Sequence, residues 1–130
     1  MRRASRNSIK QIKTLRQRPQ FLRVQDHGRR WVSPSVVLQQ APAAEEGIRF
    51  GITVTKKVSK SAVVRNRIRR RLRAAALDIL PLEARTGDYV LIGRIETQNI
   101  PYDKLCSDLR WCLKRLDCLE GAGAGPGGTP

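Results

Sequence analysis

The stretch KKVSKSAVVRNRIRRRLR, residues 56–73, is typical of a loop that leads into a helix. Between Arg65 and Arg73, six of the nine residues are arginine and none is acidic. Like charges four residues apart repel on a helix, so this density of cations lowers the stability of the isolated helix. A polyanion that neutralised the arginines would offset that cost. The stretch therefore predicts a helix that meets an anionic partner.

The helix predicted from this stretch is amphipathic and packs on a core. Ser61 suits its N-cap, and Pro81 is expected to end it. The apolar residues fall within a sector of about 80° when each residue turns the helix by about 100°. They are Val64, Ile68, Leu72, Ala75 and Ile79. The arginines occupy the rest of the circumference, so they are expected on the exposed side.

Strands are predicted on both sides of this helix. Residues 48–55 alternate strictly between apolar and other side chains, so one face of this strand meets a core. The other face carries a cation, a glycine and two hydroxyl groups, and it can face solvent or a ligand. Residues 88–95 are apolar on both faces for most of their length, which is typical of a strand in the middle of a sheet.

Three further elements complete the pattern. Residues 18–28 predict a short helix, with Pro19 at its start and Gly28 just past its end. Residues 31–40 predict one strand, whose first half is an edge or a bulge because of Pro34. Residues 101–120 predict a last helix whose core stripe is Leu105, Leu109, Cys112, Leu113 and Leu116. The order is a helix, two or three strands, a helix, a strand and a helix, with three strands giving αβββαβα. It favours an α+β fold, a single sheet with helices packed on it.

The chain of 130 residues is expected to form one domain, at residues 15–120. Residues 1–14 are basic and polar and predict a disordered arm. An acid-free start with arginine and serine also fits an organelle targeting segment. Residues 121–130 are rich in glycine and proline and predict a disordered tail.

The balance of charge narrows the class of partner. The chain carries 26 lysines and arginines against 11 acidic residues, a formal net charge of +15. Such a charge on a small domain indicates binding to nucleic acid or to an anionic membrane surface. No apolar run approaches the roughly 20 residues that a membrane span needs, so a soluble protein is expected.

The sequence offers no catalytic group of its own. The single histidine, His27, has no nucleophilic partner, and the sequence contains no glycine-rich phosphate loop. Cys106, Cys112 and Cys118 have neither the spacing of zinc ligands nor an even count, so we interpret them as reduced thiols. The expected function is binding, in which arginines donate bidentate hydrogen bonds to phosphates.

Two segments resemble a known family. The segment AVVRNRIRR, residues 62–70, follows a GITVT strand and the lysine pair at 56–57. The segment LRQRPQFLRVQDHG, residues 15–28, has a Leu, a Phe, a Val and a Gly at characteristic spacings, and a buried strand ends in Gly93-Arg94. Together these segments resemble the protein component of bacterial ribonuclease P. The resemblance covers roughly residues 15–116 in matching order.

This resemblance implies a domain similar to domain 2 of ribosomal protein S5, with an unusual left-handed βαβ crossover. It also implies a ribonucleoprotein that removes the 5′ leader from precursor tRNA. In that family the catalyst is an RNA with bound Mg²⁺, and the protein alone holds no cofactor. The implied partners are the ribonuclease P catalytic RNA and precursor tRNA, in the cytoplasm, with no membrane and no protein partner required.

By position, the resemblance implies two RNA-binding surfaces and no catalytic or metal-binding residue. The surface that faces the catalytic RNA would comprise Arg65, Asn66, Arg67, Arg69, Arg70 and Arg73. The second surface would be a leader-binding cleft lined by Phe21, with Lys56 and Lys57 near phosphates at its edge. From spacing alone, Phe21 also fits core packing, and Asn66 also fits a capping or solvent-facing role.

The chain departs from the family at three places. Gln25 and Gln39 stand where many members carry an aromatic residue, and the loop at residues 58–64 is one residue longer than usual. Stacking is worth about 1–3 kcal/mol per base, so a more polar cleft with weaker leader binding is expected. The charge also fits a non-catalytic RNA-binding protein of the ribosomal type, or a DNA-binding helix. No helix-turn-helix precedes residue 62, which disfavours DNA.

Overall fold

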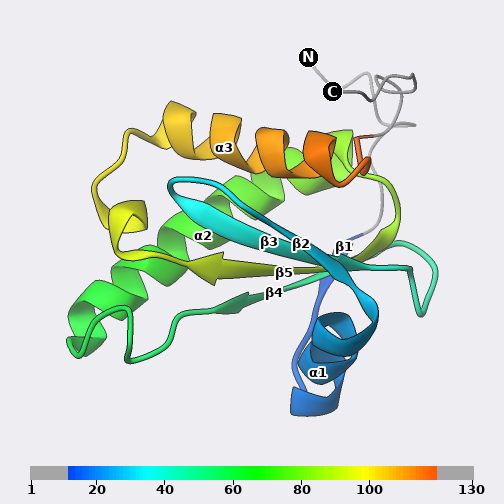
Figure 1. Cartoon of the computed structure of the whole chain (residues 1–130), viewed down its shortest axis with the longest axis horizontal. Helices are drawn as coiled ribbons and strands as arrows, with labels where there is room; N and C mark the ends of the chain where they lie inside the picture. The colour runs from blue at the N-terminus through cyan, green and yellow to red at the C-terminus, as the bar shows by residue number, and fades with distance from the viewer. Residues whose placement is uncertain (1–11, 120–130) are drawn as a thin grey trace.

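The computed structural model describes residues 12–119 as one sheet with helices on both faces (Figure 1). The elements follow in the order β1 (Ile12–Thr14), α1 (Arg18–His27), β2 (Arg29–Val32), β3 (Val36–Ala41), β4 (Ile48–Thr53), α2 (Ala62–Glu83), β5 (Gly87–Gly93), the 3₁₀ helix η2 (Ile95–Gln98) and α3 (Tyr102–Arg115). The α+β class predicted from the sequence is confirmed.

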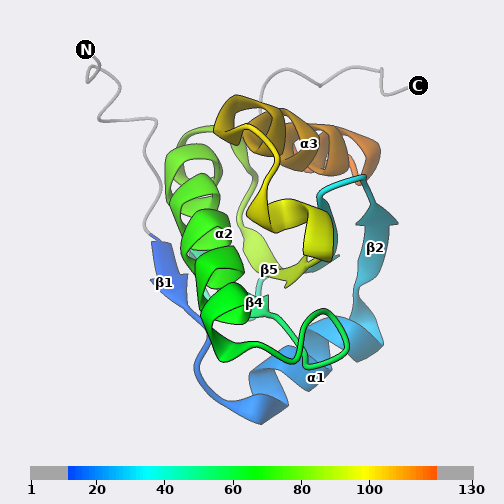
Figure 2. The ribbon, with the colours of Figure 1, turned by 90° about the vertical axis from the view of Figure 1, so that its left-hand side faces the viewer.

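The five strands form a mixed sheet in the order β1-β4-β5-β3-β2. The pairs β1–β4 and β4–β5 are parallel, whereas β3–β5 and β2–β3 are antiparallel. As predicted from its apolar run, β5 is the central strand. Helices α2 and α3 cover one face of the sheet, and α1 lies against the other (Figures 1 and 2).

The connection from β4 through α2 to β5 is left-handed. In Figure 2 the strand order runs from β1 on the left to β2 on the right, and β4 and β5 run toward the viewer. Helix α2 passes over the sheet, and the chain then returns on the right of β4 as β5. This sense is opposite to the usual one for parallel crossovers. It places α2 over the outer part of the sheet, where Arg73 and Leu77 line a hollow together with β1.

Two cores hold the layers together. The main core lies between the sheet and α2 with α3, and it includes the fully buried Ile68, Leu72, Leu105 and Leu109. The smaller core lies under α1 and comprises Leu15, Val24, Ala41 and Val90, with Phe21 and Ile92 packed against it. Within residues 12–119, no helix is long and apolar enough to cross a membrane.

The first helix shows why a glycine follows it. Gly28 has an ordinary extended backbone, with φ of −105°, so it is not needed for a left-handed turn. A Cβ atom there would lie 2.4 Å from the backbone oxygen of Gln40. The glycine therefore permits the end of α1 to approach β3 closely, which fixes α1 against the sheet.

The predicted arm was wrong at its end, because Ile12–Thr14 form β1. This strand pairs with the first half of β4, and Ile12 packs against the main core. Three residues are too few to show a strand period in a basic sequence, and the partner strand supplies the reason that they extend. The rest of the predicted arm, residues 1–11, and the predicted tail at 121–130 lie outside the described residues.

The single strand predicted at residues 31–40 is a hairpin of two strands, β2 and β3. Pro34 lies in the turn between them, where its missing N–H is not required by the sheet. The N–H of Ser33 donates to the backbone oxygen of Val36 at 3.0 Å, and its hydroxyl donates to the same oxygen at 2.6 Å. The buried Ser33 side chain thus closes the turn.

Two predicted helix ends were also wrong. Pro81 does not end α2, which continues to Glu83, because a proline in the last turn removes only one backbone hydrogen bond. The backbone N–H of Ala84 still donates to Leu80 at 3.1 Å. Helix α3 ends at Arg115 rather than at residue 120, since Asp117 takes a positive φ of 59° and the N–H of Cys118 turns back to Leu113 at 2.7 Å.

Candidate nucleic-acid interface

Local hydrogen bonds fix the start of α2. The hydroxyl oxygen of Ser61 accepts from the N–H of Val64 at 3.3 Å, which confirms the predicted N-cap. The hydroxyl oxygen of Ser59 accepts from the N–H of Ser61 at 3.1 Å. The guanidinium of Arg65 donates to the backbone oxygen of Ser59 at 2.9 Å. The loop before α2 is therefore tied to the first turn of the helix, and Arg65 is partly occupied by this role.

The outer side of α2 carries the arginines that the sequence predicted to be exposed. Ile68 and Leu72 are fully buried against the sheet, which orients the helix. Four arginines are exposed, namely Arg67, Arg69, Arg70 and Arg73. Asn66 is also exposed, and its side-chain oxygen accepts from Arg69 at 3.2 Å. The six residues predicted to face RNA thus lie on one helix, with Arg65 half-buried and the others exposed.

Arg71 has a different role from its neighbours. Its guanidinium donates to the backbone oxygens of Gln98, at 2.9 Å, and Ile100. These two residues belong to the connection between β5 and α3, so Arg71 joins α2 to that connection. It stabilises the fold, and it is not among the residues predicted to face RNA.

This difference predicts opposite effects for two adjacent arginines. Arg71→Ala is expected to lower the free energy of unfolding by about 1–3 kcal/mol, because two partly buried carbonyl groups lose a charged donor. Arg70→Ala is expected to change it by less than about 0.5 kcal/mol, since Arg70 is exposed. Urea denaturation followed by circular dichroism measures both. Equal losses for the two variants would contradict the structural role of Arg71.

The arginine face has no acidic partner within the protein. Across residues 12–119, no arginine of α2 forms an ion pair, although ion pairs occur at Arg23, Arg49, Arg85, Arg94 and Arg110. The side chains of Arg67, Arg70 and Arg73 form no hydrogen bond with another described residue either. Their donors are therefore available to an external anion, and the apolar packing of α2 holds them in one orientation.

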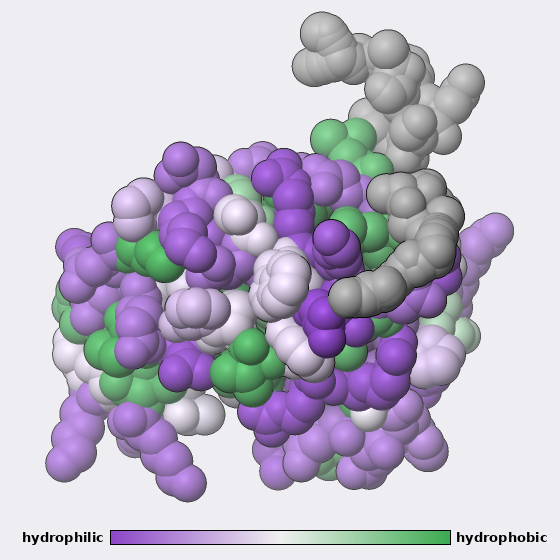
Figure 3. Space-filling view, turned by 45° about the horizontal axis from the view of Figure 1, so that its top comes forward, coloured by the Kyte–Doolittle hydropathy of each residue, from purple (hydrophilic) through white to green (hydrophobic). Residues whose placement is uncertain are grey.

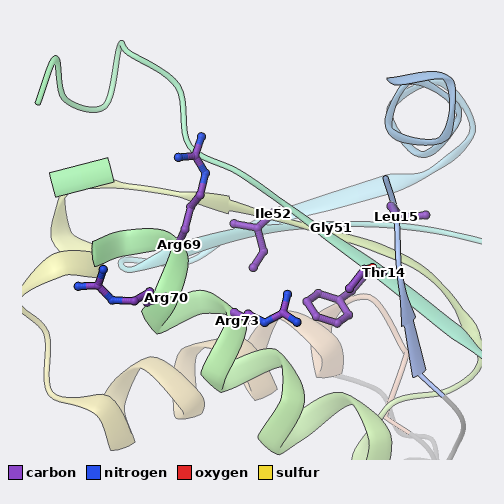
Figure 4. A pocket seen from close by; sticks show the side chains of 8 residues that line it. Thr14, Leu15, Gly51, Ile52, Arg69, Arg70 and Arg73 are labelled. Carbon is purple, nitrogen blue, oxygen red and sulfur yellow. The ribbon is translucent and has the colours of Figure 1, made fainter. Parts of the chain in front are cut away.

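A hollow lies between these arginines and the sheet (Figure 4). Its volume is about 250 Å³, and the lining residues come from β1 and the residue after it, from β4 and from α2. They are Thr14, Leu15, Phe50, Gly51, Ile52, Arg69, Arg70 and Arg73. Figure 4 shows Arg69, Arg70 and Arg73 on the helix side, with Thr14, Leu15 and Ile52 on the sheet side. The hollow thus combines an apolar floor with a cationic wall.

The opposite face of the sheet carries Phe21, the residue predicted to line a leader cleft. Phe21 is half-buried, and its ring lies over Gly51, where a Cβ atom would be 2.5 Å from the ring. Gln39 and Gly51 both pair with Val90, so all three face the α1 side of the sheet. Phe21 therefore contributes to the smaller core and retains an accessible edge beside a polar neighbour.

Lys56 and Lys57 lie in the loop that follows β4 and are exposed. Neither forms a hydrogen bond or ion pair with another residue in the described range. They stand a few residues beyond the strand that carries Gly51, at the end of the sheet where α2 begins (Figure 2). This position lies between the face that holds α1 and the face that holds α2.

An ion-pair cluster that the sequence did not reveal fixes α1 on the sheet. Asp88 is fully buried and binds the guanidinium of Arg49 through both oxygens, at 3.0 and 2.7 Å. Arg23 of α1 donates to Asp88 at 2.8 Å and to the backbone oxygen of Pro42 at 2.8 Å. Asp88 raises the pKa of Arg49 by hydrogen bonding, so this arginine stays charged. The only signal in the sequence is one cation within an alternating strand.

The remaining polar side chains do not form a metal site. Within residues 12–119, no group of three or more His, Cys, Asp or Glu side chains could hold a metal ion. The three cysteines are buried and free, and burial raises the pKa of the Cys112 thiol to about 11. On the face drawn in Figure 3, hydrophobic residues form small separate patches among hydrophilic ones. The part of that face which is not covered by grey atoms therefore shows no large apolar docking surface.

Known proteins with similar sequences share one description. A family model described as Ribonuclease P matches residues 9–117. The ribonuclease P protein component of Paramagnetospirillum magneticum is 46% identical over 112 residues, which cover 82% of this chain and 84% of the relative. The protein component of Ruegeria pomeroyi is 47% identical over 110 residues, covering 81% and 86%.

Solved structures agree with the fold. The ribonuclease P protein of Staphylococcus aureus superposes with a TM-score of 0.65 at 24% identity, covering 78% of this chain and 92% of that one. The protein from Thermotoga maritima gives a TM-score of 0.65 at 22% identity, covering 75% and 91%. The family match and the two relatives, together with this fold, show that the chain belongs to the bacterial ribonuclease P protein component family.

Proposed function

We propose that this chain binds the catalytic RNA of ribonuclease P through α2 and the 5′ leader of precursor tRNA through the cleft beside α1. In this proposal it assists removal of the leader, while the RNA carries the chemistry. The observation that supports it best is the arginine face of α2, whose exposed donors have no acidic partner among the described residues. We place the assembled particle in the cytoplasm, where precursor tRNA is made.

The α2 face suits the backbone of a folded RNA. Arginine offers planar, paired donors that match the oxygens of a phosphate. The exposed arginines at 67, 70 and 73 follow one side of the helix, so they can meet successive phosphates without rearrangement of the protein. Asn66 shares its oxygen with Arg69, which directs its amide N–H groups toward a base edge or a 2′-hydroxyl. The contacts serve docking, not bond cleavage.

The cleft beside α1 suits a single strand. Phe21 can stack on one base through the part of its ring that remains exposed, and Gln39 offers a donor and an acceptor on the same face of the sheet. Gln25 is exposed on α1, one turn after Phe21. With one aromatic residue and two glutamines, the cleft is more polar than a pair of stacking platforms. Leader binding here is expected to depend on hydrogen bonds as well as on stacking.

Magnesium fits the RNA rather than the protein in this proposal. Mg²⁺ prefers carboxylate, phosphate and water oxygens. The α2 face and the hollow carry no carboxylate, their polar side chains besides the arginines being Asn66 and Thr14, and the arginines repel a cation. We therefore assign the metal ions of the reaction to the catalytic RNA and the substrate. What the protein contributes is local neutralisation of phosphate charge and positioning of the leader.

Reconstitution tests the proposal. The chain is combined with the catalytic RNA of its own organism and a precursor tRNA, and cleavage is measured from low to high Mg²⁺. The protein is expected to lower the Mg²⁺ requirement and to raise the affinity for precursor tRNA. A protein that bound the catalytic RNA without any gain in leader-dependent cleavage would support the non-catalytic alternative instead.

Phe21→Ala separates the cleft from the core. If Phe21 stacks on a leader base, the variant is expected to bind precursor tRNA about tenfold more weakly, with no change for mature tRNA. Leu22→Ala, at the neighbouring exposed apolar position of the same helix, serves as a control that leaves the cleft side chains intact. Filter binding to both RNAs, with a thermal melt of each variant, measures the effect. An equal loss for both RNAs would identify Phe21 as a core residue only.

A further inference from the structure

The hollow beneath the α2 arginines has the size of a site for a small group. Its volume of about 250 Å³ is below the range of about 300–1,000 Å³ that is usual for pockets of drug-sized molecules. Phe50 is 2% exposed and Leu15 is 5% exposed, so the floor is apolar and belongs to the folded core. One flat aromatic group fits these dimensions, whereas a duplex does not.

The wall of the hollow is cationic and partly fixed in place. Arg69 donates to the backbone oxygen of Val54 at 3.3 Å and to Asn66 at 3.2 Å, so its guanidinium is held at the rim. Arg70 and Arg73 also line the hollow and have no hydrogen bond or ion pair within residues 12–119. In Figure 4 the Arg73 side chain points toward the sheet side of the hollow, whereas the Arg70 side chain points away from it. An anion held by Arg73 would therefore lie directly beside the apolar floor.

The edge of the sheet adds hydrogen-bonding groups. Strand β1 pairs with Ile48, Arg49 and Phe50 and then ends. The backbone oxygen of Phe50 accepts from the N–H of Leu15 at 2.7 Å, so it points away from β5. Ile52 is two residues further along, and therefore directs its N–H and C=O toward the same edge, where no strand follows. A backbone donor and acceptor side by side can read the edge of a base.

The hollow also continues along α2. A second one, of about 400 Å³, shares Thr14, Phe50 and Arg73 with the first. Its lining adds the cations Lys13 and Arg16. A strand with one phosphate at Arg73 would therefore place its next phosphate near these two residues. The two hollows form a groove with cations on both sides of an apolar floor.

We infer that this groove receives one unstacked nucleotide, with its base against Ile52 and Thr14 and a phosphate on Arg73 (Figure 4). The inference rests on the proposed function, because the nucleotide is delivered by an unpaired position of the catalytic RNA that docks on α2. The inference adds recognition of one base to that function, because contacts to phosphates alone do not distinguish one base from another. A free nucleoside monophosphate has the same chemistry and is the other source to test.

Filling the groove tests the inference. Ile52→Trp and Thr14→Trp each place an indole ring at the wall of the hollow and keep every arginine. Leu82→Trp, on an exposed site near the end of α2, is the matched control. Binding of each protein to the catalytic RNA is measured, and the reactivity of its unpaired bases toward base-specific reagents is mapped. Thermal melts by circular dichroism check that each variant folds, and Thr14→Trp alters only the short edge strand.

We expect the unmodified protein and Leu82→Trp to protect one or two unpaired bases of the RNA. The two groove variants should lose that protection and bind about tenfold more weakly, as the loss of one stacked base predicts. In a second arm, nucleoside 5′-monophosphates are titrated while the NMR signals of Thr14 and Ile52 are followed. Saturable shifts without a change in RNA protection would assign the groove to free nucleotides.

Folded groove variants with unchanged RNA protection, and no response to monophosphates, would overturn the inference. That result differs from a failure of the proposed function. If the proposed function were wrong, the unmodified chain itself would not bind the catalytic RNA, and the monophosphate arm would still report on the groove. If only the groove were wrong, the unmodified chain and all three variants would bind the RNA equally.

Discussion

Asp88→Asn is expected to lower the free energy of unfolding by about 3–5 kcal/mol, the usual cost of leaving a buried charge without its partner. Asp88 is 0% exposed and Arg49 is 6% exposed, so neither group is well screened by water. The variant keeps the volume of the side chain but removes the charge that Arg49 and Arg23 share. Urea denaturation at neutral pH measures the change.

Glu96→Gln is the control for this prediction. Glu96 pairs with Arg94 at 3.5 Å, and the Glu96 side chain is 55% exposed, so its loss should cost at most about 1 kcal/mol. A similar small cost for Asp88→Asn would contradict the account of the buried cluster. Since Arg23 reaches Asp88 from α1, a folded Asp88→Asn protein should also bind the leader more weakly, because α1 is less firmly held.

The double variant Arg67→Ala with Arg70→Ala is expected to bind the catalytic RNA at least 100-fold more weakly. Each exposed arginine can donate a charged hydrogen bond to phosphate, worth about 1.5–3 kcal/mol, or roughly tenfold or more in affinity. Each lost phosphate contact should also reduce the slope of log K against log salt by about 0.7–0.9. The slope should therefore fall by about 1.4–1.8 for two contacts.

A second double variant, which removes two arginines outside α2, controls for the effect of net charge on RNA binding. Arg85 and Arg110 are exposed, and each already pairs with an acidic residue. The variant Arg85→Ala with Arg110→Ala has the same net charge as the first pair, and it should retain most of the affinity. Equal losses for the two double variants would show that RNA binding follows net charge rather than the α2 face. Fluorescence anisotropy at several salt concentrations distinguishes these results.

The sequence predicted well the elements in which apolar side chains recur at a regular spacing over several repeats. The apolar stripe of α2 from Ile68 to Ile79 is buried, and the alternation at residues 48–54 is a strand in the sheet. These patterns persist because every second or fourth side chain must avoid water. Val64, at the start of the same stripe, is only half-buried, since the first turn of α2 extends beyond the sheet.

The features that the sequence did not predict depend on local contacts, which the periodicity of apolar residues does not reveal. Strand β1 exists because the free edge of β4 offers partners, and three residues show no period. The hairpin of β2 and β3 depends on the buried Ser33 side chain, which closes the turn around Pro34. The cluster at Asp88 depends on the pairing of Arg49 with Asp88 across two strands. Contacts of this kind are set by tertiary structure.

The predicted RNA-facing residues follow the same division. The position of Arg67, Arg70 and Arg73 outside the apolar stripe could be predicted from helical spacing alone. The hydrogen bond from Arg69 to the backbone oxygen of Val54, at the rim of the hollow, could not be predicted from helical spacing. Val54 lies just after β4, 15 residues before Arg69. Phe21 fits both of its alternatives, since it packs on a core and keeps an exposed edge.

The central claim is that two faces of this small domain contact two different RNAs. Site-directed crosslinking in the three-component complex tests it most directly. Arg67→Cys on α2 and Gln25→Cys on α1 are each labelled with a photoactivatable aryl azide. The native thiols at 106, 112 and 118 are buried, and burial raises the pKa of Cys112 and Cys118, so they should react slowly at neutral pH.

The unmodified chain, treated with the same reagent, is the control and should give no crosslink. The account predicts that position 67 crosslinks to the catalytic RNA and position 25 to the leader of precursor tRNA. Crosslinks from position 67 to the leader, or from both positions to the same RNA, would contradict it.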